Sequence, residues 1–326
     1  MTEPRKIAAR WRSDAGKTLA EEVVARLLAR RPLDNLGLGT HEGRVDLRGL
    51  PFPQSKRLRR FEKDGWFIEE LSDRICFKNA QLAGLDLSGA VMDTVRFWDT
   101  RVEDCRLDGA RCQHVGLIRT EVTDSSFVGA DFRQAALGVW ADGGNIFRRV
   151  TFGGADFRVG SCPAATFIDC DFSQTRIEKV DFQSSSFVRC RFAGELREVM
   201  FYDHGFKTGK PDPNPMEDVD FADAVLRDVE FRHLNLDRVA FPKGPDHLVV
   251  RRYRCAVERA IAELAGDDSR DARLLKVSFE HRLKWAGPQQ EIGVFSLVDY
   301  EQRGGQQLGE RASEILRRCE AGCLKR

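Results

Sequence analysis

Residues 145–192 read NIFRR VTFGG ADFRV GSCPA ATFID CDFSQ TRIEK VDFQS SSFVR CRF, and the third residue of every group is apolar. The same five-residue period extends from about Ile75 to Lys243, and all 17 Phe in that stretch lie on it. A period of five matches neither the 3.6 residues of a helical turn nor the alternation of an ordinary strand. The backbone must therefore turn a corner in every repeat.

A second inward position lies two residues before each large residue, and it is usually small. Its occupants include Ala80, Ala90, Cys105, Ala110, Ser125, Ala130, Ala135, Ala155, Ala165, Cys170 and Cys190. One large and one small side chain per repeat can fill a narrow tube at interior density. The other three positions are rich in Asp, Arg, Ser, Gly and Gln. The pattern predicts a solenoid in which each unit buries its apolar face against its neighbours.

Three segments show the repeat most clearly: Ala130-Asp131-Phe132, Ala155-Asp156-Phe157 and Val219-Asp220-Phe221. In these segments the chain resembles the pentapeptide-repeat family, whose signature is Ala-(Asp/Asn)-(Leu/Phe)-X-X. The resemblance implies a mainly β fold, a right-handed quadrilateral β-helix with four repeats per coil, here over residues 75–243. We expect α-helical flanks on both sides of it.

With four repeats per coil, positions twenty apart should stack. One predicted column holds Leu87, Leu107, Phe127, Phe147, Phe167 and Phe187, and the next holds Met92, Cys112, Phe132, Phe152, Phe172 and Phe192. The period has two irregular segments, residues 138–145 and 207–218. We expect both to leave the tube as surface segments, the first because Trp140 and Asp142 fit poorly inside it, and the second because proline cannot join a ladder. We expect the register to continue unchanged beyond both.

The flanks lose the five-residue period. Residues 1–74 are interpreted as a helical N-terminal cap region with a helix over 17–31, an early strand at 45–49 and a short basic helix from Lys56 to Lys63. Residues 244–326 are interpreted as a helical C-terminal region. Its predicted helices are His247–Ala265, Asp271–Trp285, with Leu274, Leu275, Phe279 and Leu283 as its apolar stripe, and Glu310–Leu324. This is more than a cap needs, so the region is also a candidate homodimer interface.

Charge and composition exclude several functional classes. The three regions carry net charges of +4, −5 and +2, so no strong field points to direct nucleic-acid binding. No apolar run approaches 18 residues, and no signal peptide is recognised, so we expect a cytoplasmic protein without a membrane span. The nine Cys show no zinc-site spacing, and those on the repeat are read as reduced core residues. No catalytic, metal or cofactor motif is found, so we expect neither enzyme activity nor a cofactor.

The remaining candidates for function are side chains on the outer surface of the repeat. Candidate binding residues lie just after the large positions: Val128, Ile168 and Val188 in one expected column, and Trp98 and Ile118 in another. Trp140 and Asp142, in the irregular segment, complete the set. Apolar columns on flat β faces can be docking sites. The alternative is that β-branched residues simply favour strand surfaces.

Two functions follow from this reading. The first is a rigid scaffold for binding another protein. The second follows from the resemblance, because some members of the family mimic a DNA duplex, bind type II topoisomerases such as gyrase, and protect them from inhibitors. Duplex DNA carries about one negative charge per 1.7 Å, and a region of net charge −5 falls far short of that. We therefore favour the scaffold.

Overall fold

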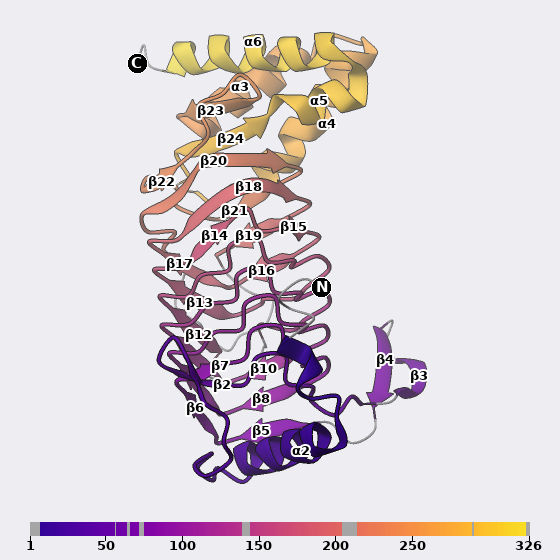
Figure 1. The fold of residues 1–326 in the computed structure, drawn as a ribbon. Helices are drawn as coiled ribbons and strands as arrows, with labels where there is room; N and C mark the ends of the chain where they lie inside the picture. Colours follow the sequence, from indigo (N-terminus) through magenta and orange to yellow (C-terminus); the bar gives the residue numbers. More distant parts are fainter. Residues whose placement is uncertain are drawn as a thin grey trace.

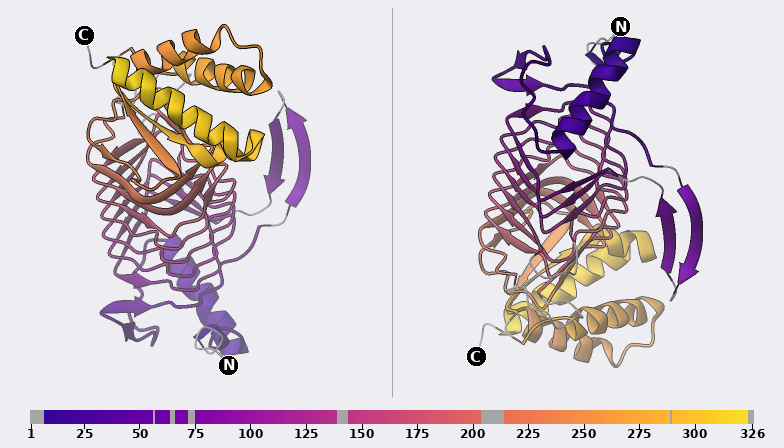
Figure 2. Two further views of the ribbon diagram at one scale, coloured as in Figure 1. Left: turned by 90° about the horizontal axis from the view of Figure 1, so that it is seen from above. Right: turned by 90° about the horizontal axis from the view of Figure 1, so that it is seen from below.

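The computed structural model describes residues 7–55, 57–63, 66–71, 75–138, 144–203, 214–288 and 290–323, with the backbone alone for 57–63 and 66–71. Figure 1 shows a long stack of coils between two caps, with α2 (Asp14–Leu28) at one end. The cap at the other end contains α3 (Tyr253–Leu264), α4 (Arg270–Lys284), α5 (Leu297–Gly304) and α6 (Gln306–Cys323). A two-stranded hairpin of β3 (Arg57–Lys63) and β4 (Trp66–Leu71) stands beside the stack in both views of Figure 2.

Parallel pairing between successive coils builds the stack. β8 (Arg96–Trp98) pairs with β5 (Cys76–Lys78) and with β10 (Gly116–Ile118), and the partner residues are 20 positions apart. Each of these coils therefore contains four five-residue units. Large residues from all four units of a coil are buried in one continuous core. The structure is thus mainly β, with parallel strands.

The pairs form four columns. The first contains β6 (Gln81–Ala83), β9 (Arg101–Glu103), β11 (Glu121–Thr123), β12 (Asn145–Arg148), β13 (Ala165–Ile168) and β17 (Ser186–Val188). The second contains β5, β8, β10, β16 (Asp181–Gln183), β19 (Met200–Tyr202) and β21 (Glu230–Arg232). The third contains β2 (Arg44–Asp46), β7 (Leu85–Asp86), β14 (Asp171–Ser173), the first part of β18 (Arg191–Arg197), β20 (Val219–Arg227) and β22 (Val239–Ala240). The fourth consists of single bridges, β15 (Ile177–Glu178) and the ends of β18 and β20.

A left-handed residue at each corner explains the period of five. The second residue after a large position has positive φ in unit after unit: Asn79, Gly84, Gly89, Thr94, Asp99, Asp104, Gly109, His114, Arg119, Asp124 and Gly129. This conformation reverses the side on which the next residues point, and it suits Gly, Asn and Asp best. The polar composition of this position therefore reflects backbone geometry as well as exposure to solvent.

The small inward position has a second role when it is Thr, Ser or Cys. The hydroxyl of Thr100 donates to the carbonyl of Phe77, 23 residues earlier, and Thr120 does the same to Phe97. The thiols of Cys170 and Cys190 make the equivalent contact. These side chains connect successive coils from within the wall of the tube, which explains why cysteines occur there.

The predicted register fails at residues 138–145. Val122 of β11 pairs with Phe147 of β12, 25 positions on, so this coil contains one unit more than a regular 20-residue coil. Phe127 consequently stacks on Phe152, with ring centroids 5.6 Å apart, and not on Phe147 as expected. A segment of five residues keeps the spacing of large residues but moves every later residue to the next side. The count by fives could not detect this shift.

The corrected columns contain three ladders of stacked rings, one of which comprises Phe182, Phe201 and Phe231. The longest comprises Phe127, Phe152, Phe172, Phe192, Phe221 and Phe241, with centroids 4.7 to 6.1 Å apart. Another comprises Phe147, Phe167 and Phe187. A further change of coil length follows in the sequence, because Phe201 pairs with Phe231, 30 positions on. The segment 204–213, which holds most of the predicted loop, lies outside the described residues.

The N-terminal region is only partly helical. Ser13 caps α2 by accepting a hydrogen bond from the Gly16 N–H. β2 pairs with β1 (Thr40–His41) and with β7, and Leu47 and Leu50 are fully buried. This segment thus forms the first, partial coil.

The predicted helix from Lys56 to Lys63 is wrong. Residues Arg57–Lys63 form β3, which pairs antiparallel with β4 (Trp66–Leu71). The sequence contains the hairpin signal Asp64-Gly65 followed by an aromatic and β-branched run, which favours strands. The basic composition of the first strand concealed it.

The C-terminal region begins with a strand where a helix was expected. β23 (His247–Arg251) pairs antiparallel with β24 (Ile292–Ser296). The helices α3 (Tyr253–Leu264), α4 (Arg270–Lys284), α5 (Leu297–Gly304) and α6 (Gln306–Cys323) then enclose a second core. A disulfide between Cys255 and Cys323, which the sequence did not indicate, connects α3 to the end of α6.

Candidate interaction surfaces

Trp98 and Ile118 meet on the outside of the second column. They are direct partners in the pairing of β8 with β10, and the Trp98 side chain is 38% exposed. Lys78 Nζ and Arg119 Cζ lie 5.9 and 5.5 Å from the indole ring. The prediction that Trp98 and Ile118 are neighbours is therefore confirmed, and the structure adds two cations around the exposed indole ring.

The other expected column is divided by the change of register. Ile168 and Val188 are neighbours across β13 and β17, and both are half-buried. Val128 instead follows Phe127 on another side, where it is 45% exposed beside Gly153. The grouping of Val128 with the other two was therefore wrong, for the same reason as the stacking of Phe127. Trp140 and Asp142 lie outside the described residues.

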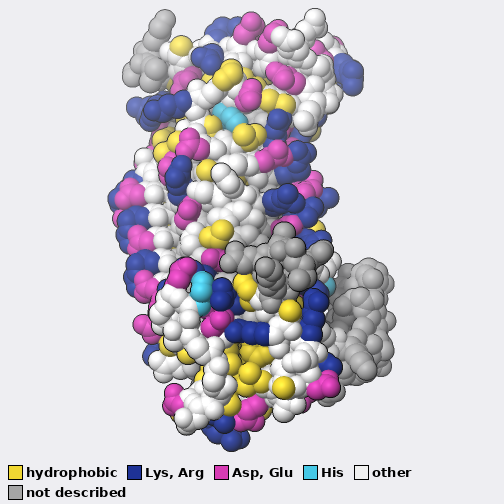
Figure 3. All heavy atoms as spheres, viewed as in Figure 1, with side chains coloured by type: hydrophobic (Ala, Val, Ile, Leu, Met, Phe, Trp, Pro, Cys, Tyr) yellow, Lys and Arg dark blue, Asp and Glu magenta, His cyan; other side chains and the backbone are white. Residues whose placement is uncertain are grey.

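One corner of the rod carries a regular series of ion pairs. Arg149 donates twice to the Asp124 carboxylate at 2.6 and 2.7 Å, and Arg189 donates twice to Asp169 at 2.6 and 2.9 Å. Two further pairs, Arg44 with Asp104 and Arg238 with Asp218, complete the series. The left edge of the rod in Figure 3, where β12, β13 and β17 lie in Figure 1, alternates basic and acidic side chains.

These ion pairs lower the pKa values of the acidic side chains and balance their charge. Hydrogen bonds from Arg149 and Arg189 hold the pKa values of Asp124 and Asp169 below the ordinary range. The carboxylates are therefore ionised at neutral pH, but each is matched by a guanidinium. The corner is rich in charge and nearly neutral.

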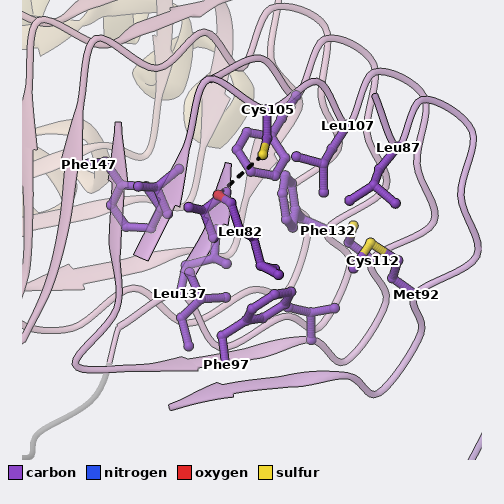
Figure 4. Close-up of a pocket in the computed structure, with 15 residues that line it drawn as sticks. Leu82, Leu87, Met92, Phe97, Cys105, Leu107, Cys112, Phe132, Leu137 and Phe147 are labelled. Carbon is purple, nitrogen blue, oxygen red and sulfur yellow. Dashed lines mark hydrogen bonds between the residues drawn. The ribbon is translucent and has the colours of Figure 1, made fainter. Parts of the chain in front are cut away.

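The interior of the tube contains a small void in its N-terminal half. A cavity of about 30 Å³ is lined only by apolar side chains, among them Leu82, Met92, Cys112 and Leu137. Figure 4 shows these side chains converging from several coils. The sulfur atoms do not make it reactive, because burial raises the pKa of the Cys112 thiol well above the ordinary value. Five of the cysteines on the repeat are free and buried, as the sequence predicted.

Side chains cap both ends of the β-helix, with hydrogen-bond donors at the N-terminal end and acceptors at the C-terminal end. At the N-terminal end Arg10 Nη2 donates to the Asp46 carbonyl at 2.7 Å, and Trp11 Nε1 donates to the Arg48 carbonyl at 2.8 Å. At the C-terminal end the Leu226 N–H donates to His247 Nε2 at 3.0 Å.

Asp299 closes the same C-terminal end, because its Oδ2 accepts a hydrogen bond from the Asp228 N–H at 2.9 Å. Side chains thus replace the missing neighbouring coil at both ends, with donors at one and acceptors at the other.

A groove of about 550 Å³ lies where the last coil meets the C-terminal helices. α4 forms one wall with Arg270, Arg273, Leu274 and Val277, while Asp228 and Glu230 contribute from the β-helix. This groove was not predicted from the sequence, and Leu274 was expected on the apolar stripe of its helix. The sequence does contain a signal for a second apolar face on this helix. Leu274 and Val277 are three residues apart, so they are neighbours on the helix surface, and they lie off the buried stripe of Leu275 and Phe279.

The described residues hold no group of three or more His, Cys, Asp or Glu side chains placed to bind a metal ion. In the same part of the chain, no helix combines the length and apolar character needed to cross a membrane.

Several solved structures are similar to parts of this chain. The chain is similar to QnrB1, a plasmid-mediated fluoroquinolone resistance protein, at 13% identity and a TM-score of 0.27, over 48% of this chain and 79% of that one. It is also similar to HetL from the cyanobacterium Nostoc, involved in heterocyst differentiation regulation, at 12% identity and a TM-score of 0.25, over 69% and 97% of the two chains. Its structural neighbours are pentapeptide-repeat proteins.

A third such neighbour is Rfr23 from the cyanobacterium Cyanothece, at 9% identity and a TM-score of 0.17, over 51% of this chain and 88% of that one. No protein-family model matches the sequence, and no curated protein matches it. The assignment of the architecture therefore rests on the five-residue period and the coils of this chain.

Proposed function

We propose that this protein is a non-enzymatic, right-handed quadrilateral β-helix that serves as a rigid scaffold for binding another protein. The observation that carries the proposal is the continuous pairing of coils from β5 to β21 in one column. Such pairing holds outward side chains on successive coils at the inter-strand distance of about 4.8 Å. A partner would meet a fixed lattice with little ordering entropy to lose on binding.

Exposed apolar side chains on this lattice support the proposal. Trp98, Val128 and Val159 are 38%, 45% and 57% exposed. Val159 is also held at a φ of 58°, which is unfavourable for a β-branched residue. Its neighbours along the corner, Gln134 and Lys179, have the same conformation without the branch. Aromatic and apolar anchors on a rigid support are what protein interfaces use.

The alternative, mimicry of DNA to bind a type II topoisomerase, has less support. A mimic needs an unneutralised row of acidic groups, whereas Asp124 and Asp169 are each matched by an arginine. A gyrase supercoiling assay with and without a quinolone tests it. We expect no protection at micromolar protein, and clear protection would favour the alternative over a general scaffold.

Two further expectations from the sequence stay predictions: a cytoplasmic location, and a homodimer formed through the C-terminal helices. Cell fractionation tests the first, and light scattering at several concentrations tests the second.

To test the scaffold function, the purified protein is used as bait to capture partners from a lysate of the source cells, and the recovery of each partner is quantified. Bait carrying Trp98→Ala, Val159→Asn or both is compared with wild type, and Arg12→Ala, at an exposed position of the N-terminal cap, is the control. We expect at least one reproducible partner whose recovery falls several-fold in a surface variant but not in the control. Absence of any partner enriched over an unrelated rod-shaped bait would contradict the proposal.

A further inference from the structure

The groove beside α4 combines exposed apolar side chains with two arginines, Arg270 and Arg273. Val277 is 65% exposed and Leu274 is 37% exposed. By contrast, Leu275 and Phe279 on the buried stripe of α4 are fully buried. Within the part of the chain that the structure describes, the Arg270 side chain makes no ion pair or hydrogen bond, and Arg273 donates only to the Asp268 carbonyl. Helix, apolar patch and cations thus form one side of a single concave surface.

The acidic side chains of the groove are already occupied. Asp228 Oδ1 accepts from Arg303 Nη2 at 2.6 Å, and Glu230 Oε1 lies 3.2 Å from His281 Nε2. Glu230 is also paired with Arg232. The charges left to meet a ligand are therefore those of Arg270 and Arg273, so the open side of the groove is positive and favours a negative partner.

The floor of the groove is fixed. Ser278 and Tyr300 share a hydrogen bond of 3.0 Å between α4 and α5. Behind them the Arg282 guanidinium donates to the Val294 carbonyl at 3.1 Å and lies 4.8 Å from the Phe295 ring. These contacts hold α4 against α5 and β24, so the groove is preformed and a ligand need not open it.

We propose that this groove binds an acidic, amphipathic segment of a partner protein, with an apolar side chain against Leu274 and Val277 and carboxylates facing Arg270 and Arg273. The proposal rests on the scaffold function and names the chemistry of the partner at one site. Two exposed apolar residues one helical turn apart match the spacing of anchors on an amphipathic segment. A small anion would leave this apolar pair in water.

The test uses fluorescence anisotropy with the full chain and two labelled peptides of 14 residues. One carries Leu at every third or fourth position and Glu at the others, and the second has Lys in place of every Glu. The groove variants are Val277→Ser and the double change Arg270→Glu with Arg273→Glu. The control, Arg12→Glu with Arg31→Glu, makes the same charge change at exposed positions of the opposite end. Circular dichroism verifies that every variant is folded.

We expect the acidic peptide to bind wild type and the control equally, and the double groove variant at least 10-fold more weakly. Val277→Ser should weaken binding about 3-fold or more without changing its salt dependence, which the arginines set. Equal binding of the two peptides, equal affinity in the groove and control variants, or no binding of the acidic peptide would each overturn the proposal. A wild-type dimer that Val277→Ser dissociates would also overturn it, because a second copy would then occupy the groove.

The same variants separate this proposal from the general scaffold function. If cellular partners are captured equally by wild type and by the double groove variant, the groove proposal fails and the scaffold stands. If no partner is captured at all, the scaffold fails irrespective of the peptide result.

Discussion

The two halves of the tube fill the same backbone with different side chains. Before Phe127 the large positions hold mainly Leu, Val, Met and Cys, and a void of about 30 Å³ remains among them. From Phe127 onward they hold mostly Phe, whose rings stack at 4.7 to 6.1 Å. The left-handed corner conformation and the parallel pairing between coils recur in both halves. The backbone thus sets the period, while side-chain volume decides how well the tube is filled.

The largest expected effect comes from removing a ring in the Phe-rich half. Phe152 is fully buried, and its ring lies 5.6 Å from Phe127 and 5.0 Å from Phe172. Phe152→Ala should lower the free energy of unfolding by about 3–5 kcal/mol, because neighbouring coils cannot collapse into the cavity. Urea denaturation followed by circular dichroism measures this. A loss below about 1 kcal/mol would mean that the ring is not in a filled core.

A matched pair of cysteines compares the halves directly. Cys112 lines the void and Cys162 does not, although both are buried. Cys162→Leu should destabilise the protein by about 1–3 kcal/mol through overpacking. Cys112→Leu should be neutral or stabilising by about 1 kcal/mol, since the void accepts the added methyl groups. The same denaturation experiment decides, and equal losses for the two variants would remove the contrast between the halves.

The corner at Val159 tests whether the backbone is indeed common to both halves. Gly109, Gly129 and Gly154 have a φ of 63° to 69° at their own corners, and Val159 has a φ of 58°. Val159→Gly should therefore raise the melting temperature, with a gain of about 1 kcal/mol from relief of the left-handed strain. The control is Val128→Gly, at an exposed position without positive φ, which should destabilise slightly. A loss of stability for Val159→Gly would contradict the assigned corner geometry.

The smallest expected effect concerns the C-terminal end. Burial lowers the pKa of His247 from its ordinary 6.5, and the charge of Arg227 reinforces the decrease. The negative charges of Asp246 and Asp299 oppose it without reversing it. Because the unfolded chain binds the proton more readily, the stabilisation is complete above pH 6.5 and is lost as the pH falls from there through the folded pKa. Thermal melts from pH 8 to 5 should show this loss in wild type.

His247→Gln is the control for this pH effect, because glutamine does not titrate and can still accept from Leu226. Its melting temperature should depend less on pH between 6.5 and 5 than that of wild type. Identical pH profiles for the two proteins would show that His247 is not responsible.

Much of the fold could be predicted from the sequence, because the five-residue period is a local signal. It identified the buried residues of each coil, including Phe152 and Phe172, and the small inward partners. It could not identify which residues stack, since a segment of five residues moves Phe127 from Phe147 to Phe152 without disturbing the count. Stacking depends on the path of the chain between units, and a periodic pattern contains no information about that path.

The candidate surfaces were predicted less well for a related reason. Trp98 and Ile118 are separated by one regular coil, so their contact followed from the period. Val128 and Ile168 are separated by the irregular segment, and their grouping failed. The groove at α4 depends on how the C-terminal helices pack on the last coil, which the sequence of either region alone does not specify. Only the spacing of Leu274 and Val277, which lie off the buried stripe of α4, pointed to it.

Directed disulfide formation tests the central structural claim, that the coil between the two halves contains one additional unit. Ser126 pairs with Thr151 across adjacent coils, while Ile146 lies in a different column opposite Glu121. Paired residues are close enough for a disulfide, so Ser126→Cys with Thr151→Cys should cross-link under mild oxidation, as seen by mass spectrometry of the digest. Ser126→Cys with Ile146→Cys, the pair that an unbroken 20-residue register would bring together, should not. Cross-linking of the second pair and not of the first would contradict the account.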